Sequence, residues 1–182
     1  GLIESARAEL KAAGGNLYAT AINNTGTVRA TGTTQKDGVV YFTAGEGDID
    51  NSGTIQASDA DGSGGNIRVE GKTNSTYMNS GTINGGDISI TASNIDLNSP
   101  IDAFATNAGS SLSLNAPTGQ INLDSTIGEN VPLLNITIDT ADFIGSTSSS
   151  MRASFIYLFD NAGDLSVDTE IMANDSVTID TP

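Results

Sequence analysis

The sequence predicts an all-β fold, a parallel β-helix (solenoid) of about seven rungs, and three observations support this. A five-residue phrase returns at intervals of 27 and 28 residues, as Asn-Thr-Gly-Thr-Val at 24–28, Asn-Ser-Gly-Thr-Ile at 51–55 and Asn-Ser-Gly-Thr-Ile at 79–83. Short stretches that alternate apolar and polar residues follow one another, as in 88–91 and 95–98, which is typical of strands with one buried face. No segment between these stretches has the pattern of a ten-residue amphipathic helix.

In a solenoid, residues at equal positions of successive rungs stack into columns that form the core. The repeated phrases predict one column of Val28, Ile55 and Ile83. The Gly-Gly-Asn/Asp-aliphatic phrases predict a second column of Leu17, Ile67 and Ile88. About seven rungs, each about 4.8 Å from the next, predict a rod about 35 Å long.

The residues between the strands predict tight turns. Glycine at a rung corner is expected to provide positive φ without a steric cost. Asn51 and Asn79 have two interpretations, as turn residues or as a ladder stacked inside or at the corner of the coil.

Two segments depart from the regular pattern. Residues 8–11 have helical propensity but are short, and we expect a strand of the first rung there. Residues 155–159, Phe-Ile-Tyr-Leu-Phe, predict a strand buried on both faces or covered by another segment. The predicted organisation is regular rungs over 1–127 and a less regular continuation of the same solenoid over 128–182.

The composition limits the function. The 182 residues include no Cys, His or Trp, and the formal net charge is −15. This charge argues against nucleic acid or an anionic membrane surface as a partner, because both attract clustered Lys and Arg. No apolar run is long enough to span a membrane. Gly1 is not a natural start, and no basic region followed by an apolar stretch marks a signal peptide, so we expect a fragment of a longer or processed chain.

The segments 14–32, 40–44 and 48–55 resemble the rungs of filamentous-haemagglutinin-like exoproteins of two-partner secretion. The similarity is close over 8–92, and only the alternation persists beyond it. It implies a right-handed parallel β-helix in a secreted or cell-surface bacterial protein that serves adhesion, biofilm or extracellular matrix. It also implies export through an outer-membrane β-barrel transporter, and a glycan or protein on a host or neighbouring cell as partner. The family's Asn-Pro-Asn secretion motifs have no counterpart, since the sequence contains no Asn-Pro pair.

Few residues have the pattern of a chemical site, and an enzyme is not expected. Asp48 with Asp50, and Asp59 with Asp61, are the carboxylate pairs with a spacing that acid–base hydrolysis can use. Asp59 and Asp61 also lie in a Gly- and Asp-rich stretch that suggests calcium, although it matches neither an EF-hand nor a calcium-roll repeat. No other cofactor is expected. Four Asn-x-Ser/Thr sequons are candidate glycosylation sites: Asn23, Asn74, Asn135 and Asn174.

The predicted function is that of a rigid structural and adhesive rod. Two alternatives belong to other classes. One is a self-assembling extracellular filament subunit, because the open strand edges at the ends of a solenoid can pair end to end. The other is a β-helix polysaccharide-active enzyme that uses the acidic pairs.

Overall fold

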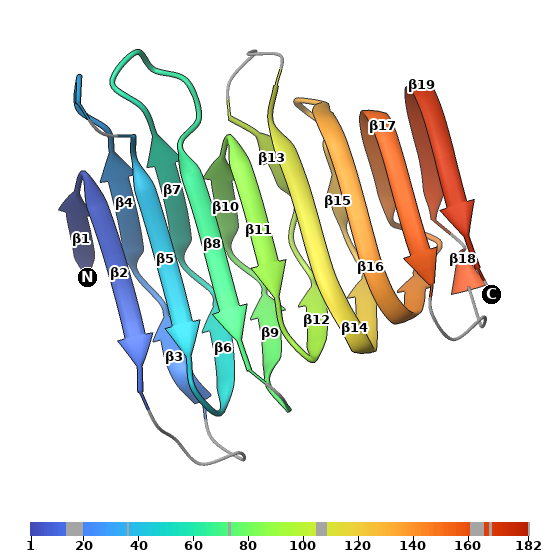
Figure 1. Cartoon of the computed structure of the whole chain (residues 1–182), viewed down its shortest axis with the longest axis horizontal. Helices are drawn as coiled ribbons and strands as arrows, with labels where there is room; N and C mark the ends of the chain where they lie inside the picture. Colours follow the sequence, from blue (N-terminus) through green and yellow to red (C-terminus); the bar gives the residue numbers. More distant parts are fainter. Residues whose placement is uncertain are drawn as a thin grey trace.

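The computed structural model describes residues 1–13, 20–35, 37–72, 74–104, 109–160, 166–167 and 169–181. Within these residues the chain forms 19 strands and no helix. The strands pair in parallel with the strands of the preceding and following rungs, so the chain winds into a flattened coil (Figure 1). Followed from the N-terminus, the coil is right-handed, and the predicted parallel β-helix of about seven rungs is confirmed.

Each rung contributes strands to three faces of the coil. Face 1 contains β1 (Leu2–Ser5), β4 (Thr27–Thr31), β7 (Thr54–Ser58), β10 (Thr82–Gly85), β13 (Ile101–Ala103), β15 (Thr126–Ile127) and the first parts of β17 (Ser150–Asp160) and β19 (Glu170–Asp180). Face 2 contains β2 (Arg7–Ala12), β5 (Val39–Ala44), β8 (Asn66–Gly71), β11 (Asp87–Thr91), the first parts of β14 (Ser111–Leu123) and β16 (Leu133–Gly145), and the second parts of β17 and β19. Face 3 contains β3 (Thr20–Asn24), β6 (Asp48–Asn51), β9 (Thr76–Asn79), β12 (Asn94–Leu97), the second parts of β14 and β16, and β18 (Ser166–Val167).

The core consists of columns of inward side chains that stay in register from rung to rung. On face 1 the column is Ile3, Val28, Ile55, Ile83, Ile101, Ile127, Met151 and Ile171. On face 2 it is Ala8, Val40, Ile67, Ile88, Leu112, Ile136, Ile156 and Val177. Val28, Ile55, Ile83, Ile67 and Ile88 are all buried. Leu17 lies outside the described residues, and the places beneath Ile67 belong to Val40 and Ala8.

Asparagine side chains form a ladder inside the coil at the end of face 3. The Nδ2 of Asn24 donates to Oδ1 of Asn51 at 2.7 Å, and the Nδ2 of Asn51 donates to Oδ1 of Asn79 at 2.7 Å. All three side chains are buried. Each terminal amide also contacts a turn, since Oδ1 of Asn24 accepts from the Gly26 N–H and Nδ2 of Asn79 donates to the Gly81 carbonyl. These asparagines therefore form an internal ladder and also bind the turn backbone, so both interpretations are confirmed.

The glycine of the repeated phrase is required for a different reason from the predicted one. Gly26, Gly53 and Gly81 do not have positive φ, so the predicted conformational role is wrong for them. A Cβ on Gly53 would overlap the Gly26 carbonyl oxygen, and a Cβ on Gly81 would overlap the Gly53 carbonyl oxygen. Close stacking of the turn backbones excludes a side chain there.

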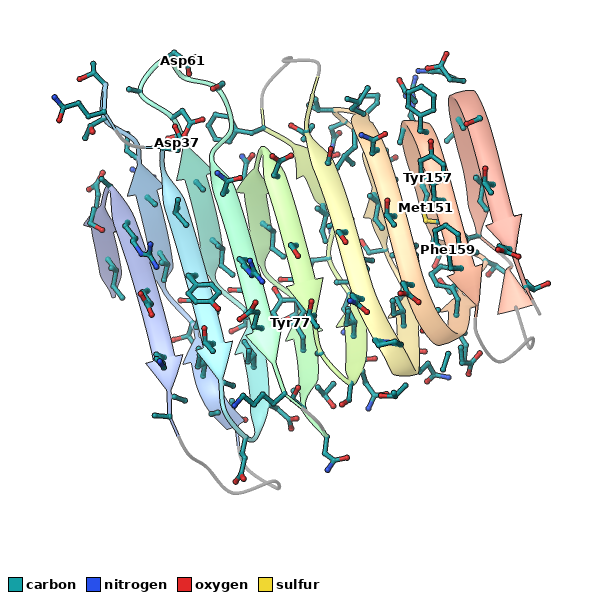
Figure 2. The ribbon with its side chains drawn as sticks, viewed as in Figure 1. Asp37, Asp61, Tyr77, Met151, Tyr157 and Phe159 are labelled. Carbon is teal, nitrogen blue, oxygen red and sulfur yellow. The ribbon has the colours of Figure 1, made fainter. Side chains whose placement is uncertain are left out.

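The segments that departed from the pattern are both strands of face 2. Residues 8–11 lie in β2, which pairs with β5 in the first rung. In β17, Ile156 and Leu158 are buried, while Phe155, Tyr157 and Phe159 are partly exposed. Figure 2 shows Tyr157 and Phe159 on the outer side of the strand. Their neighbours in β19 are Ser176, Thr178 and Asp180. The prediction that the run is buried on both faces is therefore wrong, because β17 follows the ordinary alternation of a one-sided strand.

Tyr77 is the largest fully buried side chain, and it occupies the face 3 column between Ile49 and Ile95 (Figure 2). Its hydroxyl has no hydrogen-bond partner within the described residues. Burial, together with the nearby charge of Asp50, raises the pKa of the Tyr77 phenol above its ordinary value of 10.0. A buried hydroxyl without a partner destabilises the folded state.

We expect Tyr77→Phe to increase the free energy of unfolding at pH 7 by about 1 kcal/mol, because it removes an unsatisfied polar atom and keeps the ring. The pKa of the phenol is raised in the folded state, so the wild type loses stability as the pH rises above the unfolded pKa of about 10. The variant should lose less stability over that range. Urea titrations at pH 7, 9 and 10.5 measure both effects, with Tyr157→Phe on the outer face as the matched control. A variant that is less stable than the wild type at pH 7 would mean that the hydroxyl has a partner.

Candidate functional site

Ligand contacts on this protein must involve the outer surface, because aliphatic, aromatic and asparagine side chains fill the described interior. No helix in the described part of the chain is long and apolar enough to cross a membrane. In the described part of the chain, one groove on face 2 and another at the corner between faces 3 and 1 have the size of a small-ligand site.

The groove on face 2, the Tyr41 groove, has a volume of about 490 Å³. It is formed by two neighbouring rows of outward side chains across the first four rungs. Its lining consists of the outward residues Arg7, Val39, Tyr41, Asn66, Arg68, Asp87 and Ser89, together with the inward-facing Ile67 between them. Register places Arg7, Val39, Asn66 and Asp87 in one row, and Tyr41, Arg68 and Ser89 in the next. The groove therefore combines one aromatic ring, two guanidinium groups, an amide and a carboxylate.

Tyr41 is held in place by its neighbours in the next rung. Its hydroxyl donates to Oε2 of Glu70, and the Arg68 guanidinium carbon lies 6.0 Å from the centre of the Tyr41 ring. The Nε of Arg68 donates to Oε1 of Glu70 at 2.6 Å. The hydrogen bond from Tyr41, and then the Arg68 charge, hold the pKa of the Glu70 carboxyl below its ordinary value. Glu70 is thus an ionised acceptor at neutral pH that connects the ring to the guanidinium.

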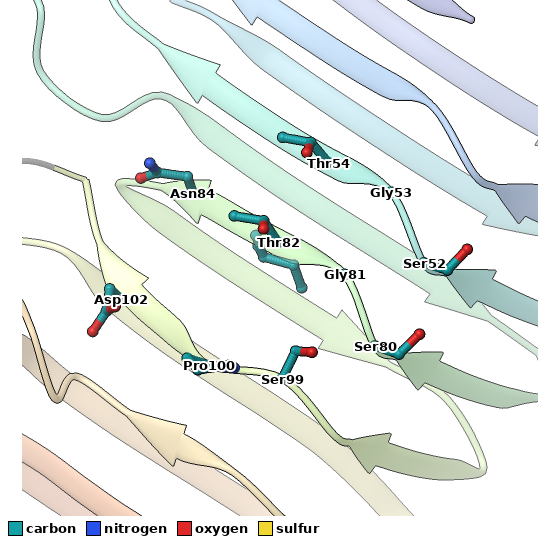
Figure 3. A pocket seen from close by; sticks show the side chains of 11 residues that line it. Ser52, Gly53, Thr54, Ser80, Gly81, Thr82, Asn84, Ser99, Pro100 and Asp102 are labelled. Carbon is teal, nitrogen blue, oxygen red and sulfur yellow. The ribbon is translucent and has the colours of Figure 1, made fainter.

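The corner groove has a volume of about 430 Å³ and lies over three stacked turns (Figure 3). Residues 52–54 and 80–84, together with Ser99, Pro100 and Asp102, line it. Hydroxyl groups dominate this lining, and no aromatic ring or cation contributes to it. Asp102 is engaged in structure, since its Oδ1 accepts from the Asn130 N–H at 3.0 Å and its Oδ2 from the Asn130 side chain at 2.8 Å.

The calcium candidates Asp59 and Asp61 lie in the loop between β7 and β8. Figure 2 shows Asp61 at the tip of this loop. Oδ1 of Asp59 accepts from the Gly38 N–H at 2.9 Å, which ties the loop to the preceding rung. Oδ1 of Asp61 accepts from the Ser63 hydroxyl at 2.6 Å and N–H at 2.9 Å, and these bonds lower the pKa of the Asp61 carboxyl. Among the described residues no group of three or more acidic side chains is placed to hold a metal ion. Calcium at this loop stays a prediction, checked by comparing the thermal midpoint in calcium and in EDTA.

The other carboxylate pair, Asp48 and Asp50, lies on the outer side of β6. Oδ1 of Asp48 accepts from the Thr76 N–H at 2.8 Å and so supports the next rung. This bond gives Asp48 a structural role in the coil.

The four sequons occupy different places on the surface. Asn23, Asn74 and Asn174 are exposed, and Asn74 has a positive φ of 66°. Asn135 is partly buried, and its Nδ2 donates to the Ser111 hydroxyl at 3.4 Å. Glycosylation at these asparagines stays a prediction.

Reasoning from the sequence missed the Tyr41 groove. Tyr41 lies between Val40 and Phe42, and Arg68 lies between Ile67 and Val69, so the alternation marks both as outward residues. The sequence does not show that Tyr41 and Arg68 are neighbours, because 27 residues separate them and only the strand register brings them together.

The fold defines a class, the parallel β-solenoid repeat proteins. Comparison of the chain with family models, curated proteins and solved structures gives no match.

Proposed function

We propose that this chain is a rigid structural and adhesive segment of a secreted or surface-attached bacterial exoprotein of the filamentous-haemagglutinin-like kind. The observation that carries the proposal is the unbroken register of the face 1 column, from Ile3 to Ile171. Each rung packs on the next through backbone pairing and an inward side chain, so neighbouring rungs resist bending. Each added rung lengthens the rod and its outer surface, and no separate folded domain is needed for this.

The proposal includes a place and two kinds of partner. The rod is exported across the outer membrane by a β-barrel transporter and then acts outside the cell, in adhesion or in a biofilm matrix. Its binding partner is a glycan or protein on a host or neighbouring cell. The sequence resemblance over 8–92 and the outer grooves support this proposal.

Adhesion of coated beads tests the adhesive role. Beads that carry the folded chain should be retained on epithelial or bacterial cell layers several-fold more than beads that carry an unfolded Ile55→Asp variant. Equal retention of the two would contradict the adhesive role. Electron microscopy of the native, full-length material tests the structural role, and thin fibres with an axial repeat of about 4.8 Å are expected. Compact particles would contradict the rod.

A second candidate, end-to-end self-assembly, is favoured by the apolar residues on both terminal rungs. Leu2 and Ile3 of β1 are 62% and 46% exposed, and Val177 and Ile179 of β19 are 44% and 47% exposed. Both pairs lie on strand edges that have a parallel partner on one side. Sedimentation velocity of the 182-residue chain should then show species that lengthen with concentration and shorten in Ile179→Lys. A concentration-independent monomer would contradict this candidate.

A further inference from the structure

We propose that the Tyr41 groove is a binding site for a neutral oligosaccharide of hexopyranose units. This inference rests on the proposed adhesive function and names the chemistry of its partner. Four features of the groove support it: the aromatic ring, the polar groups around the ring, the length of the groove and its charge.

The ring provides an apolar platform. One face of a hexopyranose carries mainly C–H bonds, and such a face packs on the electron-rich face of an aromatic side chain. Tyr41 lines the groove and is partly exposed, while its hydroxyl is bound by Glu70. Because this bond and the Arg68 contact already order the ring, little conformational entropy is lost when a ligand packs on it.

The groups beside the ring match the hydroxyls of a sugar. Asn66, Arg68 and Asp87 line the same groove, and together they supply planar donors and acceptors. A planar group with two polar atoms binds two neighbouring hydroxyls at once. The corner groove lacks both a ring and a guanidinium, so the same argument does not apply to it.

The length of the groove fits several sugar units. Its lining begins at Arg7 in the first rung and reaches Asp87 in the fourth, in one row along the coil. Three rung spacings of about 4.8 Å make about 14 Å. One sugar unit is close to one rung spacing in length, so an extended chain that lies along the coil presents successive units to successive rungs.

The charge of the groove selects a neutral ligand. Arg68 is paired with Glu70, and Nη2 of Arg7 lies 3.3 Å from Oε2 of Glu9. Each arginine charge is balanced by its glutamate partner, so the negative charge of Asp87 is the one charge of the lining that these two pairs do not balance. The whole chain adds a net charge of −15. A polyanionic glycan would be repelled by this surface, whereas neutral hydroxyls bind to either member of an ion pair.

The test measures binding of four neutral tetrasaccharides (cellotetraose, maltotetraose, laminaritetraose and mannotetraose) and of tetragalacturonate, by saturation-transfer NMR and calorimetry. At least one neutral probe should bind. Tyr41→Ala should weaken that binding about tenfold, which corresponds to about 1.4 kcal/mol. The matched control is Tyr157→Ala, which removes another outward tyrosine of face 2, three rungs away from the groove, and should leave binding unchanged.

Three results would overturn the inference: no binding of any neutral probe, equal binding by Tyr41→Ala and the wild type, or tighter binding of tetragalacturonate. The thermal midpoint of each variant shows whether it is folded. If Tyr41→Ala fails to fold, Arg68→Ala replaces it with the same expected direction. The bead assay tests the adhesive function independently of the groove. If no tetrasaccharide binds but the beads are still retained, the groove proposal is wrong and adhesion takes place through another face.

Discussion

Replacing Ile55 with Asp is expected to unfold the coil or to lower its free energy of unfolding by at least about 4 kcal/mol. Ile55 is fully buried in the face 1 column between Val28 and Ile83. A carboxylate at this place has no described cation or donor inside the column to compensate its lost hydration. Domains of this size have only about 5–15 kcal/mol of stability, so the loss is a large part of the total. Far-UV circular dichroism during urea titration measures it.

The neighbouring position on the same strand provides the control. Gln56 points outward from β7, and its Oε1 accepts from Nε of Arg29 at 3.1 Å. Gln56→Asp adds the same carboxylate beside that guanidinium, and it should change stability by less than about 1 kcal/mol. Equal effects of the two substitutions, or an unchanged stability in Ile55→Asp, would show that the inward column is wrongly assigned.

Replacing Asn51 with Ala is expected to cost about 3 kcal/mol, because Asn51 is the middle member of the asparagine ladder. The change leaves Oδ1 of Asn79 without its partner in a buried place, and Nδ2 of Asn24 keeps only the longer bond of 3.4 Å to the Thr54 carbonyl. A buried amide that loses its partner costs more than the bond itself contributes, because it was already removed from water. The free energy of unfolding from urea titration checks this value.

A triple variant with leucine at 24, 51 and 79 separates the ladder from its turn contacts. The same column continues above the ladder as Leu97 and Leu123, so the coil already accepts leucine at this position. Replacing all partners together leaves no orphaned amide within the ladder, and we expect a smaller loss than for Asn51→Ala. A larger loss would assign the main role to the bonds with Gly26 and Gly81.

Much of the fold follows from local sequence patterns. The phrases at 24–28, 51–55 and 79–83 place Val28, Ile55 and Ile83 in one column, because equal spacing along a coil means equal position in a rung. Beyond this region the interval changes, since Ile83 pairs with Ile101, only 18 residues later. The turns differ in length from rung to rung. The register of the later rungs is therefore set by backbone pairing and cannot be obtained from a repeated sequence motif.

The candidate site was less accessible from the sequence. The carboxylate pairs stood out by their spacing, yet Asp48 and Asp59 accept hydrogen bonds from the backbone of neighbouring rungs. Tyr41 lines the groove, and its hydroxyl donates to Glu70, which lies 29 residues further along the chain and belongs to no shared motif with it. The neighbours of an outward residue on adjacent strands cannot be predicted until the strand register is known.

By itself the sequence determined the class of fold, the inward and outward alternation of its strands and the first columns, because these depend on short-range periodicity and on equal spacing. Only the tertiary structure decided that the asparagines form an internal ladder, that Gly53 is required by the carbonyl of Gly26, and that Tyr41 meets Arg68 and Glu70. The physical reason is the same in each case. These contacts join neighbouring rungs through space, and the strand register that sets them is the result of packing the whole coil.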